Sequence, residues 1–145
     1  MPTPREQAIA LITRYYATFN SGDRVTFLDL LDDRVEHGLN QGATEHGKEA
    51  FRRFLERMDR CYREQVRELE VFATDDGSRG AAEFFIEGVY VNTDEGLPKA
   101  TGQTYYLRVG AFFDLCFGKV RRITNYYNLQ DWLKQVGAAC PSLLR

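Results

Sequence analysis

The hydrophobic pattern of this chain changes its period after residue 63, from helical spacing to the alternation of strands, and that change limits the folds open to it. Before it, a stripe of apolar residues recurs at helical spacing over residues 48–63. After it, apolar and polar residues alternate as in half-buried strands, over residues 69–73, 81–92, 102–116 and 119–129. Helices that precede hairpin-linked strands predict an α+β fold with the helices on one face of an antiparallel (or mixed) sheet.

The first part of the chain carries its own start and stop signals. Thr3 can cap a helix, and a glutamate three residues later completes a capping box. Gly22 can take the left-handed conformation that ends a helix, and Asp23 can cap a second, short one. Residues 35–39 alternate as a strand does, and residues 40–47 read as a polar loop. We therefore expect two helices and a short strand before the longest helix.

Length and charge are those of an ordinary globular domain. At 145 residues the chain predicts one domain over residues 1–145, with a core over about 5–133 and a tail over 134–145. The net charge is −2, and the one short basic cluster, over residues 119–122, is too sparse to follow a phosphate backbone. No apolar run is long enough to span a bilayer. We expect neither nucleic acid nor a membrane as a partner.

The cysteines and histidines do not form a cofactor or metal motif. Cys61, Cys116 and Cys140 are an odd number and widely spaced, which argues against a disulfide framework and favours a reducing compartment. The N-terminus shows no charged-then-apolar leader, so a cytoplasmic protein is expected. Zinc-ligand spacing and a phosphate-binding glycine loop are also missing from the sequence. The sequence therefore predicts no metal and no cofactor.

Long strands in a small sheet have to curve, and curvature creates a concave face. Gly88 and Gly110 are the expected sites of a bend or bulge. Aromatic residues make up 13% of the chain, with ten Phe and eight Tyr. This composition fits a cavity lined by rings between sheet and helices, an aromatic dimer face, or plain core packing.

Several short motifs resemble one family. They are Arg14-Tyr15-Tyr16, Phe19-Asn20-Ser21-Gly22-Asp23, the Leu-Leu-Asp-Asp-Arg-Val run, Gly47-Lys48-Glu49-Ala50-Phe51, Gly118-Lys119-Val120 and Asn125-Tyr126-Tyr127. Together they resemble the ketosteroid-isomerase-like, or SnoaL-like, proteins of the superfamily named for nuclear transport factor two. The resemblance covers nearly the whole chain, and its motifs are more specific for the fold than for the chemistry.

The resemblance implies a cone-shaped fold. A curved sheet would wrap around the N-terminal helices, enclose an internal pocket that opens at one end, and pair with a second copy through its outer face to form a homodimer. The superfamily contains isomerases, polyketide cyclases, epoxide hydrolases, dehydratases and non-catalytic modules, so fold alone does not assign an activity.

Two residues are the candidate catalytic groups. By the resemblance, Tyr15 lies where steroid isomerases carry the tyrosine that stabilises an oxyanion, and His37 lies about where they place their aspartate base. A neutral phenol can donate to a developing enolate, and an imidazole can remove a proton next to a carbonyl. Both could also be structural, as a core tyrosine and a strand-end histidine. If the strand register shifts by one residue, Glu36 faces inward in place of His37.

The last strand supplies further candidates. Asn125 and Tyr127 share one face by alternation, and Tyr127 matches a pocket-lining aromatic of the family. The second, protonated acid of the steroid isomerases has no counterpart around residues 108–110. The expected ligand-binding residues are Tyr16, Phe19, Asn40, Phe54, Met58, Asn125 and Tyr127.

These residues predict a pocket protein that resembles ketosteroid isomerases. The first expectation is cofactor-free proton transfer, of the isomerase or cyclase type, on a small apolar carbonyl or hydroxyl compound such as a steroid-like or polyketide-like ligand. The alternative is a non-catalytic module of the same fold that binds a small molecule or serves as a dimeric interaction module.

Overall fold

The N-terminal helices form where the capping signals lie. The computed structural model describes residues 1–39 and 42–137. Helix α1 (Pro4–Ser21) begins with a complete capping box: Thr3 Oγ1 accepts from the Glu6 amide at 3.1 Å, and Glu6 Oε1 accepts from the Thr3 amide at 2.8 Å. It ends at Gly22, whose φ of 80° is left-handed, and Asp23 caps helix α2 (Arg24–Asp29). Both helix predictions are confirmed.

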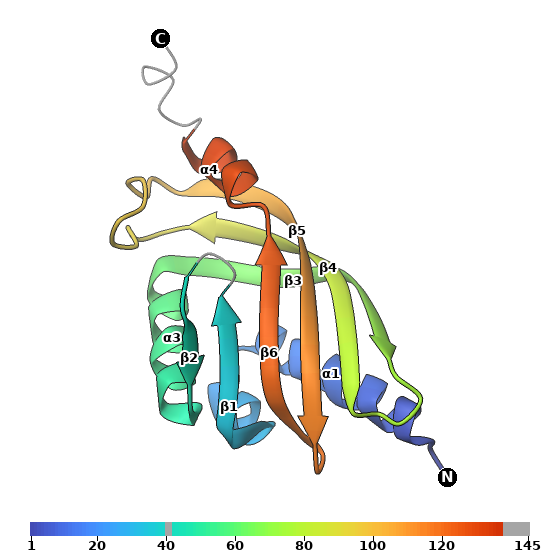
Figure 1. Cartoon of the computed structure of the whole chain (residues 1–145). Coiled ribbons are helices and arrows are strands. Elements are labelled where there is room, and N and C mark those ends of the chain that lie inside the picture. Colours follow the sequence, from blue (N-terminus) through green and yellow to red (C-terminus); the bar gives the residue numbers. More distant parts are fainter. Residues whose placement is uncertain (40–41, 138–145) are drawn as a thin grey trace.

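In the described chain, six strands form one curved, unclosed sheet with the order β2-β1-β6-β5-β4-β3 (Figure 1). The strands are β1 (Leu31–Leu39), β2 (Thr44–His46), β3 (Tyr62–Ala73), β4 (Arg79–Tyr90), β5 (Gln103–Cys116) and β6 (Lys119–Tyr127). β1 pairs with β6 in parallel, whereas the other neighbours pair antiparallel. The sheet is therefore mixed, and the α+β prediction is confirmed.

One strand lies where the sequence predicted only a loop. Residues 44–46 form β2, which pairs with β1 so that Glu36 lies opposite His46 and His37 lies opposite Glu45. A three-residue strand is too short to show an alternating pattern, so only the tertiary pairing reveals it. β1 also starts earlier than predicted, at Leu31 instead of residue 35.

Helix α3 (Lys48–Cys61) leads into β3 without a connecting loop. The predicted helix over 48–63 is two residues too long, because Tyr62 already has the extended angles φ −133° and ψ 154°. This boundary matters for the site. It makes Tyr62, Glu64 and Val66 alternate members of one strand face, which points toward the helices.

The register irregularities of the sheet lie at other positions than the two predicted. The register of β4 against β5 continues through both Gly88 and Gly110, so the expectation of bulges there is wrong. The register of β3 shifts between Arg67 and Glu70, where Glu68 adopts a positive φ of 55°. Two further shifts lie between Leu31 and Glu36 of β1 and between Asp114 and Leu115 of β5. Gly88 has a different structural role, which concerns the side chain of its β5 neighbour.

A short C-terminal helix, α4 (Leu129–Gly137), follows β6 and was not predicted. The alternating pattern suggested that the last strand continues to residue 129, whereas β6 ends at Tyr127. Trp132 and Val136 are buried, and Gln135 exchanges two hydrogen bonds, of 2.8 and 3.0 Å, with the backbone of Tyr106. These contacts hold α4 over one end of the sheet. Residues 138–145 of the expected tail lie outside the described residues.

The helices surround the concave side of the sheet. In Figure 1, α1 runs behind the long strands, α3 stands beside β1 and β2, and α4 lies beyond the end of β6. Tyr15 and Tyr16 of α1 pack against Phe113 of β5, and Tyr16 also packs against Phe84 of β4. Among the described residues, no helix is long and apolar enough to cross a membrane.

Candidate functional site

A cavity of about 470 Å³ lies between the helices and the sheet. Its wall is contributed by α1, α2, α3, α4 and five of the strands, and most of that wall is aromatic or aliphatic. The volume is in the range of small-molecule sites. The elements predicted to enclose a concave space thus leave part of it unfilled.

The cavity brings together the candidate residues from four distant parts of the sequence. Those that line it are Tyr15, Tyr16, Phe19, His37, Phe54, Met58, Asn125 and Tyr127. Asn40, the remaining candidate, lies outside the described residues.

His37 faces the cavity, and Glu36 faces away from it. The His37 side chain is only 2% exposed, stacks on Phe51 at a centroid distance of 4.3 Å and meets Phe54 edge-on at 4.6 Å. The Glu36 side chain is 40% exposed and lies 3.7 Å from His46. The open question of register is therefore resolved in favour of His37 as the inward residue.

The His37 ring is neutral at pH 7. Burial, together with the positive charge of Arg57, lowers its pKa to about 4. Its Nδ1 has no hydrogen-bond partner among the described residues, and the nearest carboxylate oxygen, Oε1 of Glu45, is 3.9 Å away. That separation is too long for a hydrogen bond, and a neutral imidazole makes no ion pair. His37 thus lines the cavity and has one buried ring nitrogen without a hydrogen-bond partner among the described residues.

The paired tyrosines of α1, Tyr15 and Tyr16, line the cavity from the side of that helix. Tyr15 and Tyr16 meet edge-to-face at 4.9 Å, and Tyr15 also packs on Phe27 at 4.6 Å. Burial raises the pKa of both phenols, so both stay protonated at neutral pH. The Tyr16 hydroxyl has no hydrogen-bond partner among the described residues. A neutral phenol of this kind can donate one hydrogen bond to a ligand oxygen.

Glu64 is a cavity residue that sequence reasoning missed. It lies on β3, is partly buried, and accepts a hydrogen bond from the Tyr105 hydroxyl of β5 at 2.5 Å. Burial raises its pKa to about 6, while the Tyr105 hydrogen bond and the charge of Arg24 act in the opposite direction. A correct helix-to-strand boundary at residue 62 would have placed Glu64 on the inward face by alternation.

A second acid–phenol pair lies at the start of β3, two residues before Glu64. Tyr62 donates its hydroxyl to Asp94 at 2.8 Å, and both residues line the cavity. The Asp94 amide donates to the Tyr90 hydroxyl at 2.9 Å, which fixes the loop after β4. The Arg57 guanidinium of α3 lies 3.8 Å from the Asp94 carboxylate, so an ion pair borders this end of the cavity. Sequence reasoning missed Asp94 as well, because it lies in a loop, where no helical or strand periodicity of hydrophobic residues indicates which side chains face inward.

The steroid-isomerase pattern is only partly reproduced around β5 and β6. Asn125 and Tyr127 line the cavity from β6, as alternation predicted. On β5 the inward residue at the predicted position is Val109, and Arg108 points outward, with its guanidinium 3.6 Å from Glu83. The acids of this cavity therefore come from β3 and from the loop after β4, not from β5.

The described residues contain no group of three or more His, Cys, Asp or Glu side chains that could hold a metal ion.

The SnoaL-like domain family matches residues 12–123, which is most of the chain. The chain belongs to the SnoaL-like domain family. No curated protein matches it in sequence.

Solved structures of similar sequence support the same family. A putative polyketide cyclase from Pseudomonas putida is 51% identical, with a TM-score of 0.87 over 94% of this chain and 99% of that one. A putative polyketide cyclase from Xanthomonas campestris is also 51% identical, with a TM-score of 0.90 over 92% of this chain and 99% of that one.

A more distant structure extends the comparison to the fold alone. It is an NTF2-like protein from Burkholderia xenovorans, 16% identical, with a TM-score of 0.71 over 91% of this chain and 97% of that one. The family's fold is thus the NTF2-like cone that the sequence motifs suggested.

Proposed function

We propose that this SnoaL-like chain is a cofactor-free enzyme of the isomerase or cyclase type. It moves a proton next to the carbonyl group of a small apolar compound, of steroid-like or polyketide-like character. The solved relatives at 51% identity are named as putative polyketide cyclases, which supports a ligand of that kind.

One observation carries the proposal: two residues that line the aromatic cavity each have a buried polar atom with no partner among the described residues. These atoms include the Tyr16 hydroxyl and His37 Nδ1. A buried polar group without a hydrogen bond costs about 1–3 kcal/mol, so such groups in a cavity point to a ligand that satisfies them. The carbonyl oxygen of an apolar compound is a suitable partner, because it accepts hydrogen bonds while the rest of the compound fits an aromatic cavity.

In the proposed reaction, the polar groups act on the carbonyl oxygen. Removal of a proton from the neighbouring carbon sends negative charge to that oxygen. The neutral phenols of Tyr15 and Tyr16 and the neutral ring of His37 donate hydrogen bonds to it in a water-poor site. This assignment changes the role expected for His37: a pKa of about 4 makes the ring a weak base but leaves one N–H to donate.

Hydrogen–deuterium exchange tests the proposal without a known substrate. We expect the purified chain to accelerate exchange of the acidic C–H groups of 2-cyclohexen-1-one or 1-tetralone in D₂O, followed by NMR. His37→Phe and Tyr16→Phe should each slow exchange by about 100-fold. His46→Gln, which alters an exposed histidine, is the control. Exchange no faster than in buffer, or equal in all variants, would overturn the proposal.

Non-catalytic binding is a second candidate, favoured by the low basicity of His37. A ligand that binds only the native state raises the melting temperature. A thermal shift with either ketone, in the absence of any exchange, would select this function instead.

We also propose that the chain forms a homodimer through the outer face of the sheet. Three aromatic side chains on that face, Tyr106, Phe112 and Tyr126, are 43–48% exposed. Tyr106 stacks on Phe85 at 4.7 Å, and Phe112 meets Tyr126 at 5.7 Å, so they form two ring pairs. Light scattering on Phe112→Glu should then report a monomer, whereas the unchanged chain gives a dimer. A monomer in both cases would refute the pairing.

A further inference from the structure

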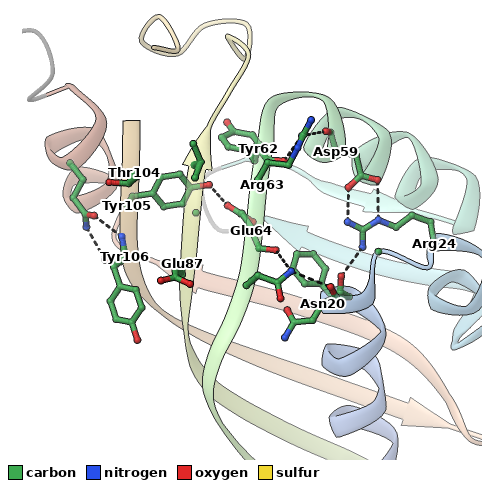
Figure 2. A pocket seen from close by; sticks show the side chains of 16 residues that line it. Asn20, Arg24, Asp59, Tyr62, Arg63, Glu64, Glu87, Thr104, Tyr105 and Tyr106 are labelled. Atoms are coloured by element: carbon green, nitrogen blue, oxygen red, sulfur yellow. Dashed lines mark hydrogen bonds and ion pairs between the residues drawn. The ribbon is translucent and has the colours of Figure 1, made fainter. Parts of the chain in front are cut away.

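A row of three residues crosses three neighbouring strands beside the cavity. Glu64 of β3 lies opposite Gly88 of β4, and Gly88 lies opposite Tyr105 of β5. Figure 2 shows the Tyr105 hydroxyl directed at the Glu64 carboxylate. The phenol thus reaches a carboxylate two strands away by lying across β4.

This reach depends on the missing side chain at position 88. A Cβ built on Gly88 would lie 2.2 Å from Cζ of Tyr105 and 2.5 Å from its hydroxyl oxygen. Such distances are far inside van der Waals contact. Only glycine leaves room for the Tyr105 ring in this position, so the residue serves the hydrogen bond and not a bend of the strand.

Glu64 also borders two spaces at once. It lines the inner cavity, and it lines an outer groove of about 1010 Å³ at the edge of the sheet (Figure 2). A carboxylate in this position can contact a molecule inside the cavity and exchange its proton with solvent through the groove. Such access on both sides suits a group that must take up and release protons in each turnover.

The surroundings of Glu64 set its basicity. Three phenols interact with it, from Tyr62 on the same strand, Tyr105 on β5 and Tyr127 on β6. Burial raises the pKa of each, so they remain neutral. The positive charge of Arg24 of α2 lowers the pKa of Glu64, and Asp59 accepts a hydrogen bond from the Arg24 guanidinium at 3.0 Å. With a pKa of about 6, Glu64 is mostly ionised at pH 7 and is a stronger base than the His37 ring.

We propose that Glu64 is the general base of the reaction, that Tyr105 is the positioning residue that orients its carboxylate, and that Gly88 provides the space for that contact. This inference rests on the proposed function. The substrate class is a carbonyl compound with an acidic C–H next to the carbonyl or in conjugation with it.

The step balances without another reactant. The C–H bond breaks, its proton passes to the Glu64 carboxylate, and its electron pair forms a carbon–carbon double bond while the carbonyl becomes an enolate. The protonated Glu64 then returns the proton to the same or a different carbon, and the enolate oxygen reverts to a carbonyl. Exchange, isomerisation and ring closure through an enolate all share this first step.

The first test compares two carboxylates of the outer groove. Glu64→Gln should reduce ketone exchange by about 100-fold or more, the usual contribution of a general base, while the ketone-induced thermal shift remains. Glu87→Gln is the matched control, because Glu87 lines only the groove and pairs with Arg67 at 3.0 Å. Exchange by Glu64→Gln at the rate of Glu87→Gln would overturn the inference, with the proposed function intact. No exchange by the unchanged chain would instead overturn the proposed function.

The second test concerns Tyr105 and measures the pH–rate profile, whose midpoint would stay unchanged if Tyr105 only stabilised the fold. The Tyr105 hydrogen bond lowers the pKa of Glu64. Tyr105→Phe should therefore shift the acid limb of the pH–rate profile to higher pH, in addition to reducing the rate. A lower rate with an unmoved midpoint would contradict the positioning role.

Carbon-13 NMR of the glutamate carboxyls supplies a substrate-independent readout. The Glu64 signal, assigned by its loss in Glu64→Gln, should titrate near pH 6. A midpoint near the ordinary glutamate value of about 4.3 would contradict the buried setting of the carboxylate from which the inference is argued.

Discussion

The contact between Gly88 and Tyr105 predicts a large stability cost for a single methyl group. In Gly88→Ala, the new Cβ would lie 2.2 Å from Cζ of Tyr105, so the ring has to move by about 1.3 Å to reach ordinary contact. The ring has little space to move, because it is 4% exposed and packs 6.0 Å from the Trp132 ring. The hydrogen bond to Glu64 is therefore expected to break.

The magnitude follows from two costs and one gain. Overpacking costs about 1–3 kcal/mol, and loss of a hydrogen bond to a charged group costs about 1.5–3 kcal/mol. Replacing glycine by alanine where the backbone allows it recovers about 0.4–1 kcal/mol through the unfolded state. Gly88→Ala should thus lower the free energy of unfolding by about 2–5 kcal/mol.

Gly110 provides the matched control. It is also a strand glycine, and a Cβ built on it meets nothing within 4 Å, so Gly110→Ala should be neutral or slightly stabilising. The free energy of unfolding of both variants is measured by urea denaturation at pH 7. The same measurement on Gly88→Ala in a Tyr105→Leu background shows how much of the destabilisation comes from the steric clash with the Tyr105 ring. If Gly88→Ala and Gly110→Ala agree within about 0.5 kcal/mol, the close packing of Tyr105 over Gly88 is refuted.

Three further predictions concern other parts of the molecule. The pKa of His37 in the folded chain, about 4, lies below its unfolded value of about 6.5, so the unfolded chain binds more protons between these values. Stability should fall by about 3 kcal/mol as the pH drops from 6.5 to 4, and urea titrations of His37→Phe should show a flatter dependence. The Asn20 side chain accepts a hydrogen bond from the Val66 amide at 2.7 Å and donates one to the Val66 carbonyl at 3.1 Å, on the edge strand β3. Asn20→Ala should therefore lower the free energy of unfolding by about 2–3 kcal/mol in urea denaturation. Asn20→Asp keeps the acceptor and should lower it by less. Thr3→Ala removes the α1 cap and should cost about 1 kcal/mol, seen as a lower melting temperature.

Local patterns in the sequence determined much of the fold. The capping box at Thr3, the left-handed Gly22 and the apolar stripe of α3 are recognisable from residues within a few positions of one another, and all three form as expected. Strand alternation likewise predicted that Asn125 and Tyr127 face one side, and both line the cavity. Such features depend on backbone geometry that repeats every two or 3.6 residues.

Alternation alone leaves the inward face of a strand undetermined. For β1 the sequence allowed either Glu36 or His37, and the choice was made by the parallel pairing with β6 and by stacking on Phe51. For β3 the sequence did not place Glu64 on any face, because the helical stripe appeared to continue to residue 63. The α3–β3 junction at residue 62 depends on strand pairing with β4.

The chemistry of the site was decided by the tertiary structure. Glu64 and Tyr105 are 41 residues apart in sequence, and their contact requires a glycine on the strand between them. Tyr62 and Asp94 are 32 residues apart and meet only because a loop folds back over the end of the sheet. Burial, hydrogen-bond partners and the resulting pKa values depend on groups brought together from distant segments, and no local period in a sequence records them.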